Sequence, residues 1–236
     1  MGISKLAVVG ATGNVGREML NILSERNFPC DEVIALASER SEGDAVPFGN
    51  KEIIVQSLSN YDFSETSIAL FSAGGKISEV YAPIAAEQGC IVIDNSSKFR
   101  MDNDVPLIVP EVNIEMLEHY RTTNIVANPN CSTIQMVVAL KPLEDLASIN
   151  RINVSTYQST SGAGKVAMEE LFNQTKGIFS NQPVEPESFT KQISFNVIPQ
   201  IGPFLENGNT EEEQKMIDET KKIMRPDILI NATCVR

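Results

Sequence analysis

A glycine-rich turn between an apolar strand and an amphipathic helix is the feature that most constrains the fold of this chain. Residues 6–9 (LAVV) form the expected buried strand, and residues 10–16 (GATGNVG) follow at once. Gly10 permits a tight turn, Gly13 lets a pyrophosphate approach the backbone, and Gly16 allows close packing of helix on strand. The phosphates of a dinucleotide would then lie against the helix N-terminus. A purely structural glycine turn is the alternative, but the strand–helix–strand setting favours nucleotide binding.

Strands and helices alternate along the first 130 residues. The expected strands cover residues 6–9, 33–37, 67–71, 90–94 and 125–127, and a helix is expected over residues 77–88. This alternation predicts a parallel sheet with right-handed crossovers, in which ligands gather at the carboxyl ends of the strands. The first helix is expected to turn one apolar face to the sheet, formed by Val15, Met19, Ile22 and Leu23.

After about residue 131 the pattern loosens. A strand is expected over residues 151–158, a helix over 165–172, a loop over 181–187 and a last strand over 227–236. Thr210 and Glu213 have the spacing of a capping box, which predicts a helix running to about residue 224. The predicted fold class is α/β: a Rossmann-like, nucleotide-binding parallel sheet over residues 1–130, followed by an α+β domain over residues 131–236.

The segment after the second expected strand bears on which nucleotide binds. A site that prefers NAD usually places an acidic residue there for the ribose hydroxyls. Residues 38–41 read SERS in this chain. Arg40 and Ser41 suit a 2′-phosphate, which favours NADP over NAD. Glu39 keeps NAD open, and a solvated loop is the alternative interpretation.

Two further turns of small residues precede helices. Residues 72–75 (SAGG) follow the strand at 67–71 and would let the backbone approach a cofactor. Residues 161–164 (SGAG) open the helix at 165–172 and suit an anionic or nicotinamide neighbour. A plain turn is an equally good interpretation of the second segment on sequence alone.

Cys131 lies between the strand at residues 125–127 and an expected helix over residues 134–140. The unpaired N–H groups and positive dipole at a helix N-terminus favour the nucleophilic thiolate of a cysteine. Asn130 and Ser132 are placed to donate hydrogen bonds to an oxyanion beside the sulfur. Such a thiol can attack a carbonyl and carry an acyl group, whereas a small buried hydrophobe is the alternative. A redox nucleotide at the same sheet edge suggests oxidoreduction through a thioester.

Charge and cysteine content exclude several classes of function. The formal net charge is −12 and the isoelectric point about 4.6, which argue against nucleic-acid or anionic-membrane partners. Four cysteines are scattered without a C-x-x-C pair, so neither a disulfide framework nor a metal site is expected. The sequence shows no signal peptide and no apolar run of transmembrane length. A cytoplasmic setting is therefore the simplest expectation.

The order of these motifs resembles the aspartate-semialdehyde dehydrogenase family, bacterial type. Besides the turns at 10–16 and 72–75, the matching segments are residues 94–100 (DNSSKFR), 109–113 (VPEVN), 128–133 (NPNCST), Gln158, 161–164 (SGAG), the Glu212/Lys215 pair and 232–236 (ATCVR). The resemblance implies NADPH-dependent reductive dephosphorylation of L-aspartyl 4-phosphate to L-aspartate 4-semialdehyde, with release of inorganic phosphate. This step feeds lysine, threonine, methionine and isoleucine biosynthesis, and the family is homodimeric through its second domain.

The resemblance also implies roles for individual residues. Cys131 would be the nucleophile, and Gln158 would orient the substrate. The groups expected to bind the substrate and its phosphate are Arg100, Asn130, Glu212, Lys215 and Arg236. The residues expected at the cofactor are Gly10, Thr12, Gly13, Asn14, Val15, Gly16, Arg40, Ser41, Ser72, Ala73, Gly74, Ser161 and Gly162. Within these sets, Glu212 would hold the amino group of the substrate and Arg236 its carboxylate.

Two alternatives remain open. One is an enzyme like N-acetyl-glutamyl-phosphate reductase, against which residues 94–100 and the Glu212/Lys215 pair argue. The other is a non-catalytic paralogue kept for nucleotide binding or subunit assembly, against which the retained Cys131, Gln158 and Arg100 argue.

One departure from the family concerns the end of the sequence. The family continues past its final arginine as Arg-Val-Pro-Val-x-x-Gly-His, and that histidine is the general acid/base, whereas this sequence ends at Arg236. The single histidine, His119, matches no catalytic motif and is expected on a surface helix. We therefore expect a C-terminally truncated member with an incomplete second domain, weak or absent NADP binding, and turnover lower by about 10²–10⁴-fold.

Overall fold

A computed structural model describes residues 3–236, which form two compact units. Unit 1 contains the chain up to Lys141 together with Lys222–Met224, and unit 2 contains Pro142–Lys221 and Arg225–Arg236. The division falls inside one helix, α4 (Cys131–Leu146). The functional boundary expected after residue 130 stays a prediction.

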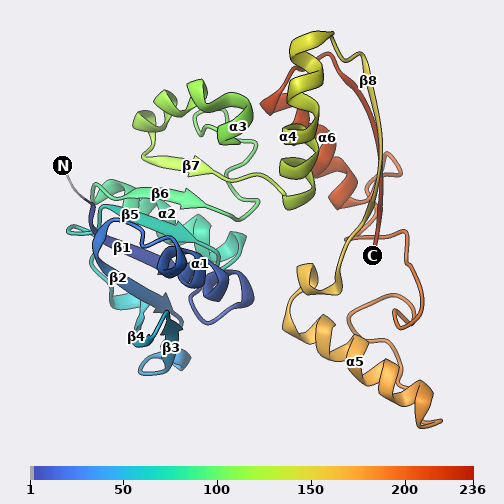
Figure 1. Ribbon diagram of the computed structural model, residues 1–236, viewed down its shortest axis with the longest axis horizontal. Helices are drawn as coiled ribbons and strands as arrows, with labels where there is room; N and C mark the ends of the chain where they lie inside the picture. The colour runs from blue at the N-terminus through green and yellow to red at the C-terminus, as the bar shows by residue number, and fades with distance from the viewer. Residues whose placement is uncertain (1–2) are drawn as a thin grey trace. The chain divides into compact units, whose positions relative to one another are not determined.

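Unit 1 is built on a seven-stranded sheet with the order β3-β4-β2-β1-β5-β6-β7 (Figure 1). The strands are β1 (Ile3–Val9), β2 (Cys30–Ala37), β3 (Ala45–Phe48), β4 (Lys51–Ser57), β5 (Ile68–Phe71), β6 (Ile91–Asp94) and β7 (Ile125–Ala127). All neighbouring pairs in this sheet are parallel except β3 with β4. The Rossmann-like α/β prediction for this half of the chain is therefore confirmed.

Helices cover both faces of the sheet because the side chains of a strand alternate between its faces. Leu6 and Val8 of β1 share a buried cluster with Leu20 of helix α1 (Asn14–Glu25). Val9 shares the other cluster with Ala82 of helix α2 (Gly75–Glu87). The central strand β1 is consequently buried on both faces, as its continuous apolar sequence requires.

The predicted core face of α1 is wrong in part. Val15 and Ile22 are 48% and 37% exposed, whereas Gly16, Leu20 and Leu23 are buried. A Cβ atom on Gly16 would overlap the backbone carbonyl of residue 10, so the helix can approach the turn this closely only with glycine there. This contact turns residue 16, and with it residues 20 and 23, toward the sheet.

The β3–β4 hairpin was not among the predicted elements. β3 is short, and both strands mix exposed with buried residues, so neither carries a continuous buried apolar run. The turn between them contains Gly49 with a φ of +60°, a conformation that favours glycine. Between β6 and β7 the chain forms the short helix α3 (Pro110–Asn113) and a 3-10 segment, Ile114–Thr122.

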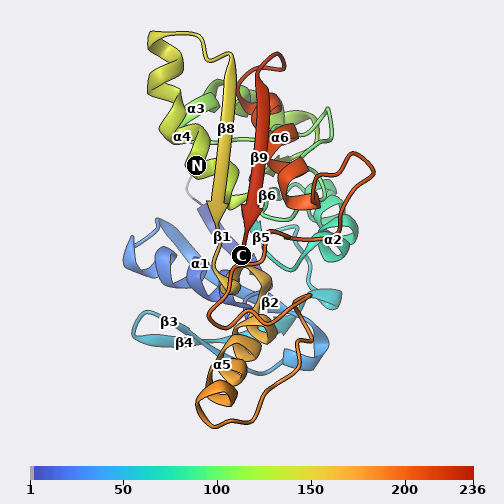
Figure 2. The ribbon, with the colours of Figure 1, turned by 90° about the vertical axis from the view of Figure 1, so that its right-hand side faces the viewer.

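Unit 2 holds two parallel strands, β8 (Arg151–Tyr157) and β9 (Leu229–Val235), which lie side by side in Figure 2. Their register runs from Arg151 opposite Leu229 to Tyr157 opposite Val235. The helices of this unit are α5 (Lys165–Phe179) and most of α6 (Glu211–Ile223).

Helix α5 extends beyond the end predicted at residue 172. Gln174 lies in the added turns and is buried, although its polar side chain gives no apolar period. Its amide donates to Glu170 Oε1 at 2.9 Å and accepts from the backbone N–H of Ile193 at 2.9 Å. The first bond lies within the helix and the second joins it to a distant segment; together they satisfy the buried amide and hold the extra turns in place.

Among residues 3–236, no helix is long and apolar enough to cross a membrane.

Candidate active site

The glycine turn after β1 has the backbone that nucleotide binding requires. Gly10 adopts a φ of +87°, and its N–H donates to the carbonyl of Leu36 at 2.8 Å. Gly13 precedes the first residue of α1, and its N–H donates to the carbonyl of Gly10 at 3.0 Å. The N-terminus of α1 is thus held at the carboxyl edge of the sheet, where backbone N–H groups can bind a phosphate.

A cavity of about 620 Å³ opens beside this turn. Six of the predicted cofactor residues line it: Gly10, Thr12, Gly13, Arg40, Ser72 and Ala73. Asn14, Val15 and Gly16 form the start of α1, Ser41 lies in the 3-10 turn after β2, and Gly74 precedes α2 with a φ of +89°.

The same cavity is lined by residues that sequence reasoning missed. Leu58 and Ser59 follow β4, a strand that was not predicted, so nothing in the sequence placed them at this edge. Ser59 Oγ donates to Glu39 Oε1 at 2.8 Å and lies 2.9 Å from Ser57 Oγ. Glu39, the residue that left NAD open, is therefore held by a hydroxyl within the protein.

Cys131 is exposed and is the first residue of helix α4. The amide oxygen of Asn130 accepts a hydrogen bond from the N–H of Ser132 at 2.8 Å, and the carbonyl of Asn130 accepts from Ile134 at 2.9 Å. Asn130 thus caps the helix and fixes its start beside the thiol. Because the side chain is exposed, the interpretation of Cys131 as a small buried hydrophobe is wrong.

Arg100 is buried and tied to the turn that leads to Cys131. Its Nε donates to the carbonyl of Asn128 at 2.9 Å, and its Nη2 donates to the carbonyl of Asn95 at 2.9 Å. The side chains of these two asparagines also bond, with Asn128 Nδ2 donating to Asn95 Oδ1 at 2.7 Å. The predicted phosphate-binding arginine is therefore held by the turn that begins three residues before the predicted nucleophile.

The buried carboxylate of Asp94 anchors the start of this network. It accepts from Ser78 Oγ at 2.7 Å and from Ser96 Oγ at 2.6 Å. These hydrogen bonds satisfy the buried carboxylate and fix the turn after β6.

In unit 2, Gln158 follows β8 and bonds to Glu212 of α6. Gln158 Nε2 donates to Glu212 Oε1 at 2.9 Å, while Gln158 Oε1 accepts from Thr156 Oγ1 at 2.9 Å. The amide orientation is thereby set from both ends. These two residues, predicted from distant parts of the sequence, are brought together by the fold of unit 2.

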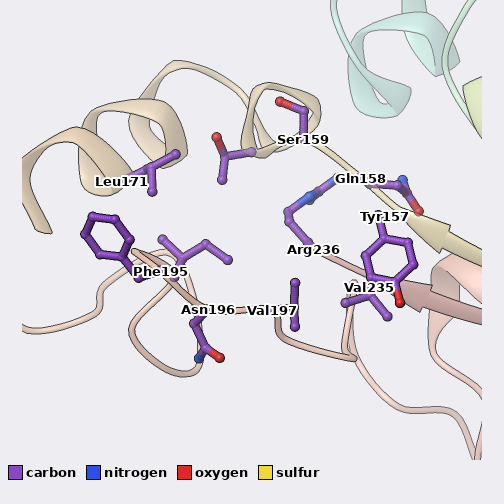
Figure 3. A pocket seen from close by; sticks show the side chains of 11 residues that line it. Tyr157, Gln158, Ser159, Leu171, Phe195, Asn196, Val197, Val235 and Arg236 are labelled. Atoms are coloured by element: carbon purple, nitrogen blue, oxygen red, sulfur yellow. The ribbon is translucent and has the colours of Figure 1, made fainter. Parts of the chain in front are cut away.

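Arg236 follows β9 and lines a cavity of about 840 Å³. Figure 3 shows it beside Gln158, at the ends of the two adjacent strands, with Phe195 and Leu171 across the cavity. A Cβ atom on Gly162 would lie 2.9 Å from Arg236 Nη2, so the predicted turn at 161–164 also meets this guanidinium. Among the described residues, the buried Nε of Arg236 has no hydrogen-bond partner.

The first turn of α6 confirms the predicted capping box. The N–H of Glu213 donates to Thr210 Oγ1 at 3.4 Å, and the N–H of Thr210 donates to Glu213 Oε2 at 2.6 Å. The Glu212/Lys215 spacing does not produce an ion pair between those two residues. Lys215 Nζ instead pairs with Glu211 at 2.9 Å, one helical turn away.

His119 is exposed on the 3-10 segment Ile114–Thr122, rather than on an α-helix. All four cysteines are free thiols. Cys90 is buried, and burial raises the pKa of its thiol to about 12. Cys131, in contrast, is exposed.

Comparison with known protein families identifies the class of protein to which the chain belongs. The family model described as semialdehyde dehydrogenase, NAD binding domain, matches residues 5–120, and the model described as semialdehyde dehydrogenase, dimerisation domain, matches residues 140–236. The chain thus has the two parts of a semialdehyde dehydrogenase.

Individual relatives narrow this class. The chain is 56% identical over 232 residues to aspartate-semialdehyde dehydrogenase 2 of Vibrio cholerae, covering 98% of this chain and 69% of that protein. It is 54% identical over 235 residues to aspartate-semialdehyde dehydrogenase of Aquifex aeolicus, again covering 98% and 69%. The crystal structure of aspartate semialdehyde dehydrogenase II complexed with ASA from Vibrio cholerae matches with a TM-score of 0.97 and 54% identity, over 100% of this chain and 70% of that one. This chain belongs to the aspartate-semialdehyde dehydrogenase family.

Proposed function

We propose that this protein reduces L-aspartyl 4-phosphate to L-aspartate 4-semialdehyde through an acyl-thioester on Cys131. The observation that carries the proposal is the exposed thiol at the first residue of α4, beside a turn held by Arg100. The exposed sulfur at this helix start is open to attack on a substrate carbonyl. Membership of the family supports the same chemistry.

The proposed first half-reaction transfers the acyl group. The Cys131 thiolate attacks the carbonyl carbon of the acyl phosphate, and an oxyanion forms on the carbonyl oxygen. Collapse of this intermediate breaks the C–O bond to phosphate, which leaves with its electron pair as inorganic phosphate. Arg100 would bind the phosphate, because a guanidinium suits its planar, bidentate recognition. Asn130 and Lys215 are the other residues that we propose to bind the phosphate.

The second half-reaction reduces the thioester. A reduced nicotinamide cofactor, when bound, supplies the hydride that reaches the acyl carbon. The C–S bond then breaks, the aldehyde is released, and the thiolate is regenerated. Gln158 would orient the acyl group, and its two hydrogen bonds support that role because they fix its amide.

The remaining roles concern the amino-acid end of the substrate. Glu212 would bind the amino group, since a carboxylate pairs with an ammonium. Arg236 would bind the carboxylate, and its buried, unpartnered Nε supports this assignment because a buried donor without an acceptor is costly.

The residues of the nucleotide cavity fit a dinucleotide. Gly10, Thr12 and Gly13 line the cavity, and Gly13 directly precedes α1, so the start of this helix borders the space for the phosphates. We infer NADP rather than NAD: Arg40 and Glu39 both line the cavity, but one oxygen of the Glu39 carboxylate already accepts a hydrogen bond from Ser59, whereas Arg40 suits a 2′-phosphate. The phosphates would contact the residues from Gly10 to Gly16 and from Ser72 to Gly74, and the nicotinamide end would contact Ser161 and Gly162.

We also infer that the protein acts as a cytoplasmic homodimer joined through unit 2. Phe172, Phe179 and Phe195 are large apolar residues of this unit and are all strongly exposed. Exposed aromatic groups of this size mark interaction surfaces. Light scattering should give twice the mass of one chain, and Phe172→Asp should shift the protein toward the monomer.

A phosphate-dependent assay tests the proposed reaction. L-Aspartate 4-semialdehyde, NADP and phosphate are supplied, and formation of NADPH is followed by absorbance. Whatever the rate of the parent chain, Cys131→Ala should abolish it, while Cys30→Ala, a substitution of another free and partly exposed thiol, should retain it. Normal turnover by Cys131→Ala would refute the thioester. Nucleotide binding without reactivity of Cys131 would favour the non-catalytic paralogue.

A further inference from the structure

Lys222, in the last turn of α6, donates three hydrogen bonds to backbone carbonyls of a single loop in unit 1. Its Nζ lies 2.8 Å from the carbonyl oxygen of Arg100, 2.7 Å from that of Asp102 and 2.9 Å from that of Val105. An ammonium has three N–H donors, so each proton has an acceptor. Lys222 belongs to unit 1 together with this loop, and the cluster is therefore internal to the unit.

Arg100 is held at its side chain as well as at its carbonyl. The guanidinium donates to the carbonyls of Asn95 and Asn128, and the carbonyl of Arg100 itself accepts from Lys222. Backbone and side chain of this arginine are thus fixed by different partners. Asn128 stands three residues before Cys131 in the turn that leads to α4.

We propose that Lys222 is a positioning residue that fixes Arg100 for phosphate binding by holding the carbonyls of Arg100, Asp102 and Val105. This inference rests on the proposed role of Arg100 as the phosphate-binding group. A bidentate contact demands a fixed guanidinium plane, which a loop anchored only at its apolar residues would not provide.

Lys222 is partly buried, unlike an ordinary surface lysine. Burial lowers the pKa of its ammonium, and the negative charge of Asp102 opposes that shift. A partly buried ammonium is costly unless its protons are bonded, so the carbonyl arrangement compensates its desolvation.

The same loop is also held by apolar side chains. Phe99 and Val105 are buried in the main cluster of unit 1. These apolar anchors remain when the lysine is replaced. We therefore expect Lys222→Met to fold and to loosen the carbonyls around Arg100.

The test measures how inorganic phosphate slows alkylation of Cys131 by iodoacetamide in the whole chain. The readout is the phosphate concentration that halves the rate, with modification of Cys131 followed by mass spectrometry. Lys222→Met should raise this concentration about tenfold, which is the lower end of what loss of an outer hydrogen-bond partner costs at metal sites. Lys221→Met makes the same replacement one residue earlier and should change it by less than about twofold.

A double variant separates positioning from a general loss of structure. Arg100→Met should remove most of the protection, and adding Lys222→Met to Arg100→Met should change it no further, because the two residues act through one interaction. Lys222→Gln keeps two N–H donors and should fall between the parent chain and Lys222→Met. It also serves if the methionine variant does not fold.

The possible results separate the role of Arg100 in phosphate binding from the role of Lys222 in positioning it. If phosphate does not protect Cys131, or if Arg100→Met leaves the protection intact, the proposed role of Arg100 is wrong and the inference falls with it. If Arg100→Met removes protection while Lys222→Met and Lys222→Gln behave like Lys221→Met, only the positioning role of Lys222 is overturned. Additive effects of Arg100→Met and Lys222→Met would also overturn that role.

Discussion

Replacing Gly16 with alanine tests how the nucleotide turn and helix α1 are joined. The new Cβ atom would overlap the carbonyl of Gly10 and press on the backbone of Ala11. Both neighbours are backbone, so no flexible side chain can move aside. The helix must therefore shift away from the turn, or the turn must open.

The size of the effect follows from two opposing terms. Overpacking of this kind costs about 1–3 kcal/mol, and contact with backbone favours the upper half of that range. Alanine in place of glycine inside a helix returns about 1 kcal/mol. Gly16→Ala should thus lower the free energy of unfolding by about 1–2 kcal/mol, which corresponds to roughly 2–8 °C in Tm for a chain of this size.

Gly75→Ala is the matched control, because Gly75 also lies at the start of a helix. Its Cβ atom would meet nothing nearer than Lys98 Cβ at 3.9 Å, which is ordinary contact. This substitution should be neutral or stabilising by up to about 1 kcal/mol.

Thermal unfolding followed by far-ultraviolet circular dichroism is the suitable assay, since the chain contains no tryptophan. Calorimetric titration with NADPH on the same samples should show weaker binding for Gly16→Ala. Equal Tm values for Gly16→Ala and Gly75→Ala would refute the argument that the close approach of residue 16 sets the position of α1.

Three further predictions concern the core face of α1, the carboxylate of Glu213 and the thiols. Leu20→Ala should lower the free energy of unfolding, measured by chemical denaturation, by about 2–5 kcal/mol, whereas Val15→Ala should change it by less than about 0.5 kcal/mol. The reverse order would show that α1 buries the face predicted from the sequence. Burial raises the pKa of Glu213, but its backbone hydrogen bonds outweigh this and leave the pKa below its usual 4.5. The stability it contributes is therefore complete above about pH 4.5 and lost as pH falls through the lowered pKa, so Glu213→Gln should flatten the acid limb of a Tm–pH curve; an unchanged limb would contradict this. At pH 8, iodoacetamide should modify Cys131 and leave Cys90, with its pKa of about 12, intact, and equal modification in peptide mapping would contradict the difference in burial.

Much of the nucleotide-binding half was predictable because its signals are local. Gly10 has the positive φ that a tight turn needs, and the strands at residues 67–71, 90–94 and 125–127 are short apolar runs with clear ends. The helix near Cys131 was also predicted, but over residues 134–140. Helix α4 begins earlier, at Cys131, because the side chain of Asn130 caps it, and it ends later, at Leu146.

The rotation of α1 was not predictable from its period alone. Val15, Ile22 and Leu23 fit an apolar stripe, but the stripe centred on Gly16, Leu20 and Leu23 is the buried one. The choice depends on one close backbone contact at Gly16, and hydrophobic spacing carries no information about it. Glycine is invisible to an apolar pattern even where it decides the packing.

Pairings between distant residues were also outside the reach of sequence. Gln158 meets Glu212 across 54 positions, and Ser59 meets Glu39 across 20 positions, the latter because an unpredicted hairpin ends beside β2. Each partner was visible as a polar residue near a strand or helix end. Which of them meet depends on the order of strands and on loop paths, neither of which a local pattern encodes.

The sequence by itself determined the parallel α/β half, the small-residue turns between strands and helices, and the position of Cys131 close to a helix start, because these depend on residues a few positions apart. Only the tertiary structure decided that Cys131 is exposed, that Arg100 is held by its neighbours Asn95 and Asn128, and that Lys222 anchors the same loop. Burial and long-range hydrogen bonds are properties of the packed chain, since they arise only when segments far apart in sequence share one volume.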